Sequence, residues 1–137
     1  MDNAYLKPLP VPDPDSQPFW QGCKQHKLLL RRCLDCRRFR FPPGPVCPHC
    51  RSRQSEWSEA SGLGQVFSWI VVHHPVPKEV YAAEVPYVVA LIELEEGVRM
   101  ASNVIACPPA EIVAGMPVRV SFEDVSEAIS LPKFRPA

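Results

Sequence analysis

Two pairs of cysteines, each pair separated by two residues, constrain the fold of this chain more than any other feature. Cys33 and Cys36 form the first pair, Cys47 and Cys50 form the second, and ten residues lie between the pairs. A two-residue spacing lets both thiolates of one tight turn reach the same ion, and two such turns complete a tetrahedral shell of four sulfurs. The pattern therefore predicts a zinc ribbon in which these four cysteines are the metal ligands.

Zinc is the metal that the pattern favours, although four thiolates also suit iron. The segment is too short to build a sufficient core unaided, whereas structural zinc contributes about 10–16 kcal/mol of apparent binding free energy. Four protein ligands leave no open position for water, so a structural role is expected. An iron-loaded, electron-transferring ribbon is the alternative, and a reddish, reducible protein would indicate it. His49 is expected at the surface, and Cys23 and Cys107 are expected to be small buried apolar residues rather than nucleophiles.

The prolines exclude a long-helix bundle or a coiled coil. They number 17 in 137 residues, and each one removes a backbone donor and fixes φ. Short elements in a mainly β fold remain. We expect an N-terminal arm with a short helix over residues 1–27, the zinc ribbon over residues 28–61 and a barrel over residues 62–137.

The N-terminal arm is expected to run extended into a short helix. Ser16 is the expected N-cap, Pro18 lies in the first turn, and the helix ends at about His26. Phe19 and Trp20 give this short element a large apolar surface. They are expected to pack on the protein's own body, and docking on a partner chain is the alternative.

The C-terminal segment has the pattern of a small β-barrel. Runs rich in β-branched and aromatic residues alternate with turn residues, and one helical turn interrupts them near residues 108–115. In the first run, even-numbered positions from 66 to 72 are predicted on one face and odd-numbered positions on the other. Three strands, a short helix and two strands are the order of a five-stranded OB-type barrel. The predicted strands cover residues 65–73, 87–94, 98–105, 118–122 and 131–134.

The order of motifs along the chain resembles that of one protein family. An FW-containing helix is followed by CxxC…PP…CPxC, by GLGQVFSW at residues 62–69, by PYVVALIELEEGVRM, by GMPVRV and by a terminal FRP. From about Phe19 to Pro136, these motifs resemble the domain-of-unknown-function family of acyl-CoA-associated proteins, in which a rubredoxin-like zinc ribbon is joined to an OB-fold. Arg37 departs from the family pattern, because glycine is usual after the first cysteine pair.

The resemblance implies a non-catalytic accessory subunit whose zinc is structural. Its partner would be a thiolase-like or related acyl-CoA enzyme, which would carry the catalytic cysteine and histidine and share an acyl-CoA with this chain. The resemblance also implies a role in lipid or steroid side-chain metabolism, where the subunit helps to form the acyl-CoA site. We therefore expect no catalytic residue in this chain and no enzymatic activity of the chain on its own.

The residues themselves agree with a binding subunit rather than an enzyme. The sequence contains no glycine-rich phosphate loop, no nucleophile elbow and no paired carboxylates at an acid–base spacing. His73 and His74 lie beside a loop without a partner at metal-ligand spacing, and the glutamates of residues 93–96 are expected to be solvated around a hairpin turn. Tyr81, on a long loop, is expected to pack locally, and a partner contact is the alternative.

The net charge of zero conceals a strongly basic segment. Residues 1–22 carry net −2, residues 23–56 carry net +7 and residues 57–137 carry net −5. The sign reverses just before the glycines of residues 62–64, which suggests two modules with different surfaces.

Seven arginines lie around the cysteine pairs. Guanidinium groups pair well with phosphates and carboxylates, and those expected to receive the phosphates of CoA or an acidic face of the partner are Arg31, Arg37, Arg38 and Arg40. The alternative is binding of single-stranded nucleic acid, with the aromatic residues Phe39, Phe41 or Trp69 stacking on bases. The acidic barrel argues against nucleic acid, and a solvated basic face without a ligand also remains open.

The sequence shows no sign of a membrane protein. Its longest apolar runs fall far short of the roughly 20 residues that span a bilayer. The first ten residues lack the charged head and apolar stretch of a secretory signal. We therefore expect a cytoplasmic location.

Overall fold

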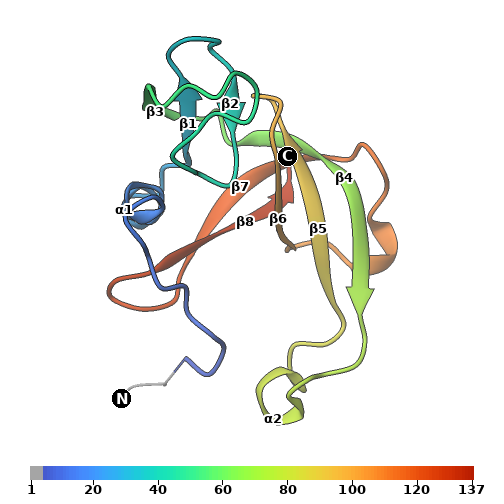
Figure 1. The fold of residues 1–137 in the computed structure, drawn as a ribbon. Helices are drawn as coiled ribbons and strands as arrows, with labels where there is room; N and C mark the ends of the chain where they lie inside the picture. Colours follow the sequence, from blue (N-terminus) through green and yellow to red (C-terminus); the bar gives the residue numbers. More distant parts are fainter. Residues whose placement is uncertain (1–4) are drawn as a thin grey trace.

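A three-stranded sheet followed by a five-stranded barrel makes up most of the chain, as Figure 1 shows. The computed structural model describes residues 5–137, so the first four residues of the expected arm lie outside the description. The fold is mainly β, as the prolines and the strand patterns predict. No helix within the described residues is long and apolar enough to cross a membrane.

The ribbon sheet consists of β1 (Leu29–Cys33), β2 (Phe39–Arg40) and β3 (Ser55–Glu59). Its strands are antiparallel, with β1 at the centre. The first cysteine turn begins where β1 ends, and the second lies in the long connection between β2 and β3. The sheet thus holds both cysteine turns at one end of the ribbon.

The barrel consists of β4 (Leu63–Val72), β5 (Tyr87–Leu94), β6 (Arg99–Val104), β7 (Pro117–Asp124) and β8 (Ser130–Pro136). It closes in the order β4-β5-β6-β8-β7, and all neighbours are antiparallel except β6 and β8. A single 3-10 turn, η1 (Pro109–Glu111), lies between β6 and β7, where the sequence predicts a helical turn. The predicted five-stranded OB-type barrel is therefore confirmed.

Alternation along β5 fixes the barrel core. Its inward residues, Val88, Ala90, Ile92 and Leu94, are all at most 2% exposed, whereas the residues between them are half-buried. Phe134 of β8 is fully buried in the same core. Burial of one large aliphatic or aromatic side chain contributes about 1.5–3 kcal/mol, so a one-residue slip of β5 would be costly.

Strand β4 departs from the predicted alternation at Phe67. A register shift between Val66 and Ser68 places one extra residue in β4 opposite β5. Val66 is buried, but beyond the shift Trp69 packs against the core and Ile70 is 62% exposed. The predicted face of even-numbered positions is therefore wrong, because a β-bulge moves the alternation by one residue.

Helix α1 (Gln17–Lys24) packs against both the ribbon and the barrel. Phe19 is 3% exposed, and its ring centroid lies 5.0 Å from that of Trp20 and 5.5 Å from that of Phe41 in the ribbon. Aromatic side chains bury the largest apolar areas, so this cluster anchors the helix. The aromatic residues of the helix pack on the protein's own body, as predicted.

Ser16 stands at the N-cap position of α1, as predicted, but its side chain makes no capping hydrogen bond to the helix. The backbone N–H of Ser16 donates to Asp13 Oδ1 at 2.8 Å, and the backbone N–H of Asp13 donates to Ser16 Oγ at 3.0 Å. This reciprocal pair closes a turn that precedes the helix, so Ser16 is the N-cap residue as predicted, but its side chain bonds to Asp13 instead of to the helix.

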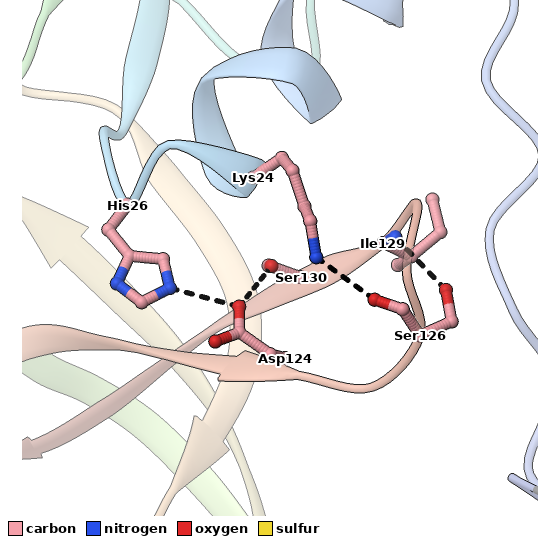
Figure 2. Close-up of polar contacts among 6 residues, drawn as sticks. All are labelled: Lys24, His26, Asp124, Ser126, Ile129 and Ser130. Atoms are coloured by element: carbon pink, nitrogen blue, oxygen red, sulfur yellow. Dashed lines mark hydrogen bonds and ion pairs between the residues drawn. The ribbon is translucent and has the colours of Figure 1, made fainter.

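The end of α1 is tied to the loop that joins β7 to β8, as Figure 2 shows. Lys24 Nζ donates to the backbone oxygen of Ser126 at 3.0 Å, and His26 Nε2 lies 2.9 Å from Asp124 Oδ1. The Ser130 hydroxyl donates to the same carboxylate oxygen. The hydrogen bond from Ser130, and after it the one with His26, lowers the pKa of Asp124 below its ordinary value.

Acid should loosen this tie, and Asp124→Asn isolates the effect. Because folding lowers the pKa of Asp124, its charge adds stability above the unfolded pKa of about 3.9, and this is lost as the pH falls through the folded pKa. We expect Asp124→Asn to lower the thermal midpoint by a few degrees at pH 7 and to match the parent protein near pH 2. Thermal melts at both pH values test this, with Glu127→Gln as the control in the same loop. A deficit of equal size at both pH values would contradict it.

A second short helix, α2 (Lys78–Tyr81), lies between β4 and β5, where the sequence predicts only a long loop. Tyr81 stacks on Tyr87 with 5.8 Å between ring centroids, so it packs locally as expected. Lys7 Nζ lies 3.1 Å from Glu84 Oε1, next to this helix. At Lys7 the arm therefore contacts the segment that joins α2 to β5.

Candidate metal centre and basic ribbon surface

The sulfur atoms of Cys33, Cys36, Cys47 and Cys50 all lie within 4.8 Å of one another. Two of these separations join the two turns, 3.5 Å between Cys33 and Cys50 and 3.6 Å between Cys36 and Cys47. A Zn–S bond of about 2.3 Å in a tetrahedron places neighbouring sulfurs about 3.8 Å apart. The geometry fits zinc, and these are the residues that would hold it.

Backbone amides prepare two of the thiols for a metal. The N–H of Cys36 donates to Cys33 Sγ and that of His49 donates to Cys47 Sγ, both at 3.4 Å. The Cys36 amide is the main reason that the pKa of Cys33 falls to about 6. Burial opposes ionisation of Cys47, but the amides of Cys50 and His49 outweigh it and lower its pKa.

The fourth thiol shows why a cation is needed. The Ser52 amide favours the thiolate of Cys50. The hydrogen bonds of Cys50 with the three other thiols act against it, and together with burial they raise the pKa of Cys50 to about 12. Four thiolates this close repel one another, and a divalent cation removes the repulsion. A closed shell of four sulfurs leaves no position for a substrate, so bound zinc would supply structure rather than catalysis.

Each cysteine turn is followed by an arginine in the left-handed backbone conformation. Arg37 follows Cys36, Arg51 follows Cys50, and both have φ of 67°. This conformation costs a non-glycine residue roughly 1–2 kcal/mol, so glycine would be favoured at either position. The sequence analysis noted the absence of glycine at Arg37 alone, and the structure shows that both residues adopt the left-handed conformation.

Arg31 and Arg40, two of the predicted anion-binding residues, are engaged within the ribbon. Arg31 lies over the ring of Trp57, 5.0 Å from its centroid, and donates to Ser55 Oγ at 2.6 Å. Arg40 is 4% exposed and donates twice to the backbone oxygen of Gly44, at 2.9 and 2.7 Å. Both guanidinium groups therefore help to hold the ribbon together.

Arg37 and Arg38, the other two predicted residues, are exposed. Arg37 Nη1 lies 3.8 Å from Glu56 Oε2, and Arg38 Nη1 lies 3.3 Å from His49 Nδ1. His49 is at the surface, as predicted. Within residues 5–137, Arg37 is the one ribbon arginine that pairs with a carboxylate. Carboxylates within residues 5–137 therefore leave most of the positive charge of the ribbon unneutralised.

The other candidate residues do not gather into a site. The histidines at 73 and 74 are exposed at the end of β4, and the four cysteines are the one group in the described chain whose side chains could share an ion. Cys23 is fully buried, and burial raises its pKa to about 12, as expected of an inert thiol. Cys107 is half-buried against the core.

Two glutamates of the hairpin turn differ from the prediction, whereas Glu95 is exposed as expected. Glu96 is half-buried rather than solvated, and its Oε2 accepts a hydrogen bond from the backbone N–H of Ser61 at 2.9 Å. Glu93 is also half-buried, and its carboxylate accepts hydrogen bonds from the side chains of Gln65 and Arg99. The contact of Glu96 joins the barrel to the segment that leaves the ribbon, a role that no sequence pattern indicated.

The aromatic residues considered for nucleic-acid stacking are covered. Phe39, Phe41 and Trp69 are all partly buried against the core. The Arg32 guanidinium lies 4.9 Å from the centroid of Phe39, and Phe41 packs on Phe19. Their rings therefore do not form an open platform for bases.

Comparison with known proteins gives the family. A family model described as "ChsH2, rubredoxin-like zinc ribbon domain" matches residues 20–56, and one described as "ChsH2, C-terminal OB-fold domain" matches residues 57–123. A DUF35 domain-containing scaffold protein of Methanocaldococcus jannaschii is 38% identical over 111 residues, which cover 79% of this chain and 77% of that protein.

Two further relatives are complex-forming proteins by name. A chain of the solved Ltp2-ChsH2(DUF35) aldolase is 43% identical, with a TM-score of 0.84 over 93% of this chain and 98% of that chain. The 3-oxo-4,17-pregnadiene-20-carboxyl-CoA hydratase alpha subunit of Mycobacterium tuberculosis is 41% identical over 110 residues, 80% of this chain but 34% of that protein. The chain spans well under half the length of the hydratase alpha subunits that it matches. It therefore belongs to the DUF35 family, and it joins a zinc ribbon of the ChsH2 type to an OB-fold.

Proposed function

We propose that this chain is a non-catalytic accessory subunit that binds a thiolase-like or related acyl-CoA enzyme and helps to form its acyl-CoA site. The likeness to a chain of the Ltp2-ChsH2(DUF35) aldolase carries the proposal, because it covers 98% of a protein named for its assembly with an enzyme. The hydratase alpha subunit of Mycobacterium tuberculosis, named for a steroid-derived CoA substrate, supports a role in lipid or steroid side-chain metabolism.

The chemistry of the described residues supports a binding role. The cysteine cluster is a closed ligand set, and the histidines and glutamates considered as catalytic groups do not converge. The exposed guanidinium groups of Arg37 and Arg38 suit contacts with CoA phosphates or with the partner, whereas Arg31 and Arg40 are bound inside the ribbon. We place the subunit in the cytoplasm, because thiols arranged as metal ligands suit a reducing compartment.

The test is a pull-down from the native host, followed by an acyl-CoA assay of the captured enzyme with and without this chain. We expect the enzyme to lose most of its activity when the chain is removed and to regain it when the chain is returned. The isolated chain should leave CoA thioesters intact. Turnover by the isolated chain would overturn the proposal, as would tight, steeply salt-dependent binding of an oligonucleotide with no effect of acyl-CoA.

A further inference from the structure

We propose that one end of the zinc ribbon docks on an acidic protein surface of the partner subunit. We call this end the ribbon tip and define it by the exposed residues Leu34, Arg37, Arg38, Pro48 and Arg51. The inference rests on the proposed function, since it names the surface through which the accessory subunit would bind its enzyme.

Backbone strain at two equivalent positions is the first observation. Arg37 and Arg51 each follow the second cysteine of a turn, and each has a φ of 67° that glycine would adopt more easily. Internal contacts of the side chains do not account for them. Arg37 reaches Glu56 at 3.8 Å in an exposed pair, a weak interaction, and Arg51 forms no ion pair within the described residues. Strained residues of this kind concentrate where a side chain serves binding.

The composition of the ribbon tip is the second observation. Leu34, inside the first turn, is 42% exposed, and Pro48, inside the second, is also exposed. Arg37 follows the turn that holds Leu34, and Arg51 follows the turn that holds Pro48. Protein interfaces combine apolar contacts with arginine in this way, and carboxylates are the natural counterpart of guanidinium groups. A free phosphate makes no apolar contact with the exposed leucine and proline, whereas a protein surface does. The ribbon tip therefore favours a protein surface.

The ribbon tip is also held in one arrangement before any partner binds. The Ser52 hydroxyl donates to Asp35, which joins the second turn to the first, and the Arg38–His49 contact at 3.3 Å joins them again. The four sulfurs within 4.8 Å fix the same end of the ribbon. A surface ordered in advance loses less entropy on association.

The double variant Arg37→Gly/Arg51→Gly tests the inference. Glycine relieves the left-handed strain, so the thermal midpoint of the zinc-loaded chain should stay the same or rise by about 2–5 °C. Affinity for the enzyme captured in the pull-down should fall about 100-fold by calorimetric titration, roughly tenfold for each arginine, and its salt dependence should weaken. The control is Arg119→Ala/Arg135→Ala, which removes two exposed positive charges from the barrel and should bind normally.

Each other outcome decides against the inference. If the wild-type chain binds the enzyme and the glycine variant binds it with the same affinity, the docking surface is overturned and the proposed function stays intact. A wild-type chain that binds no acyl-CoA enzyme would overturn both. A lower thermal midpoint of the glycine variant would assign the arginines to ribbon stability instead. If the wild-type chain alone binds CoA, and the variant loses CoA but keeps the enzyme, the tip is a phosphate subsite and not a docking surface.

Discussion

The Cys47→Ser protein should bind no structural zinc and should lose the fold of its ribbon. Cys47 is 1% exposed, and its sulfur lies 3.6 Å from that of Cys36, so serine removes one ligand from the centre of the cluster. The three remaining thiols cannot complete a tetrahedral shell. Most of the apparent free energy of zinc binding, about 10–16 kcal/mol, is therefore lost. The strands of the ribbon have 2 to 5 residues each and cannot compensate. Partner binding should be lost as well.

Zinc content and limited trypsin digestion measure this effect. We expect near-stoichiometric zinc in the parent protein and almost none in Cys47→Ser, with rapid cleavage at the arginines of residues 31–53. The matched control is Cys107→Ser, because the Cys107 thiol is half-buried and donates only to the backbone oxygen of Pro108 at 3.5 Å. A Cys47→Ser protein that resists trypsin and binds its partner normally would refute the structural role of the metal.

The elements that could be predicted from the sequence are those set by short-range rules. The two-residue cysteine spacing gives the metal ligands, because a tight turn must bring both thiols to one point. The alternation of β5 gives its buried face, because a two-residue period and burial agree there. The bulge at Phe67 has no comparable signal. It depends on how β4 pairs with β5, and the sequence of β4 alone does not determine that pairing.

The arginines show the same limit at the candidate site. Four of them were predicted to meet an anion from charge and position alone, a criterion that treats them as equivalent. Arg40 is buried and bonded to the Gly44 carbonyl, whereas Arg38 is exposed, and three-dimensional packing makes this difference. The left-handed φ of Arg51 could not be predicted either, because the sequence analysis singled out only Arg37 as standing where glycine is usual.

Phe134→Ala should destabilise the barrel by about 3–5 kcal/mol, the usual cost of removing a fully buried phenylalanine. Native domains are stable by about 5–15 kcal/mol, so this is a large share of the total. Phe134 also lies at the closing seam of the barrel. The parallel contact of β6 with β8 pairs Val104 with Phe134, and the Ile105 N–H donates to the Phe134 backbone oxygen at 2.8 Å. Loss of the ring should therefore open this seam before the antiparallel strands separate.

Urea denaturation and amide hydrogen exchange separate these two effects. The unfolding midpoint of Phe134→Ala should fall sharply, and the Ile105 amide should exchange faster relative to the amides of β5. Phe67→Ala is the matched control, because Phe67 is 46% exposed and the Arg99 guanidinium lies 3.7 Å from its ring centroid. That contact is worth about 0.5–1 kcal/mol, so the control should unfold close to the parent protein. If both variants lose the same stability, or if exchange at Ile105 does not change, then closure of the barrel does not depend on Phe134. The seam would then be held by other contacts between β6 and β8, such as the hydrogen bond that the Ser102 hydroxyl donates to the backbone oxygen of Pro132 at 2.8 Å.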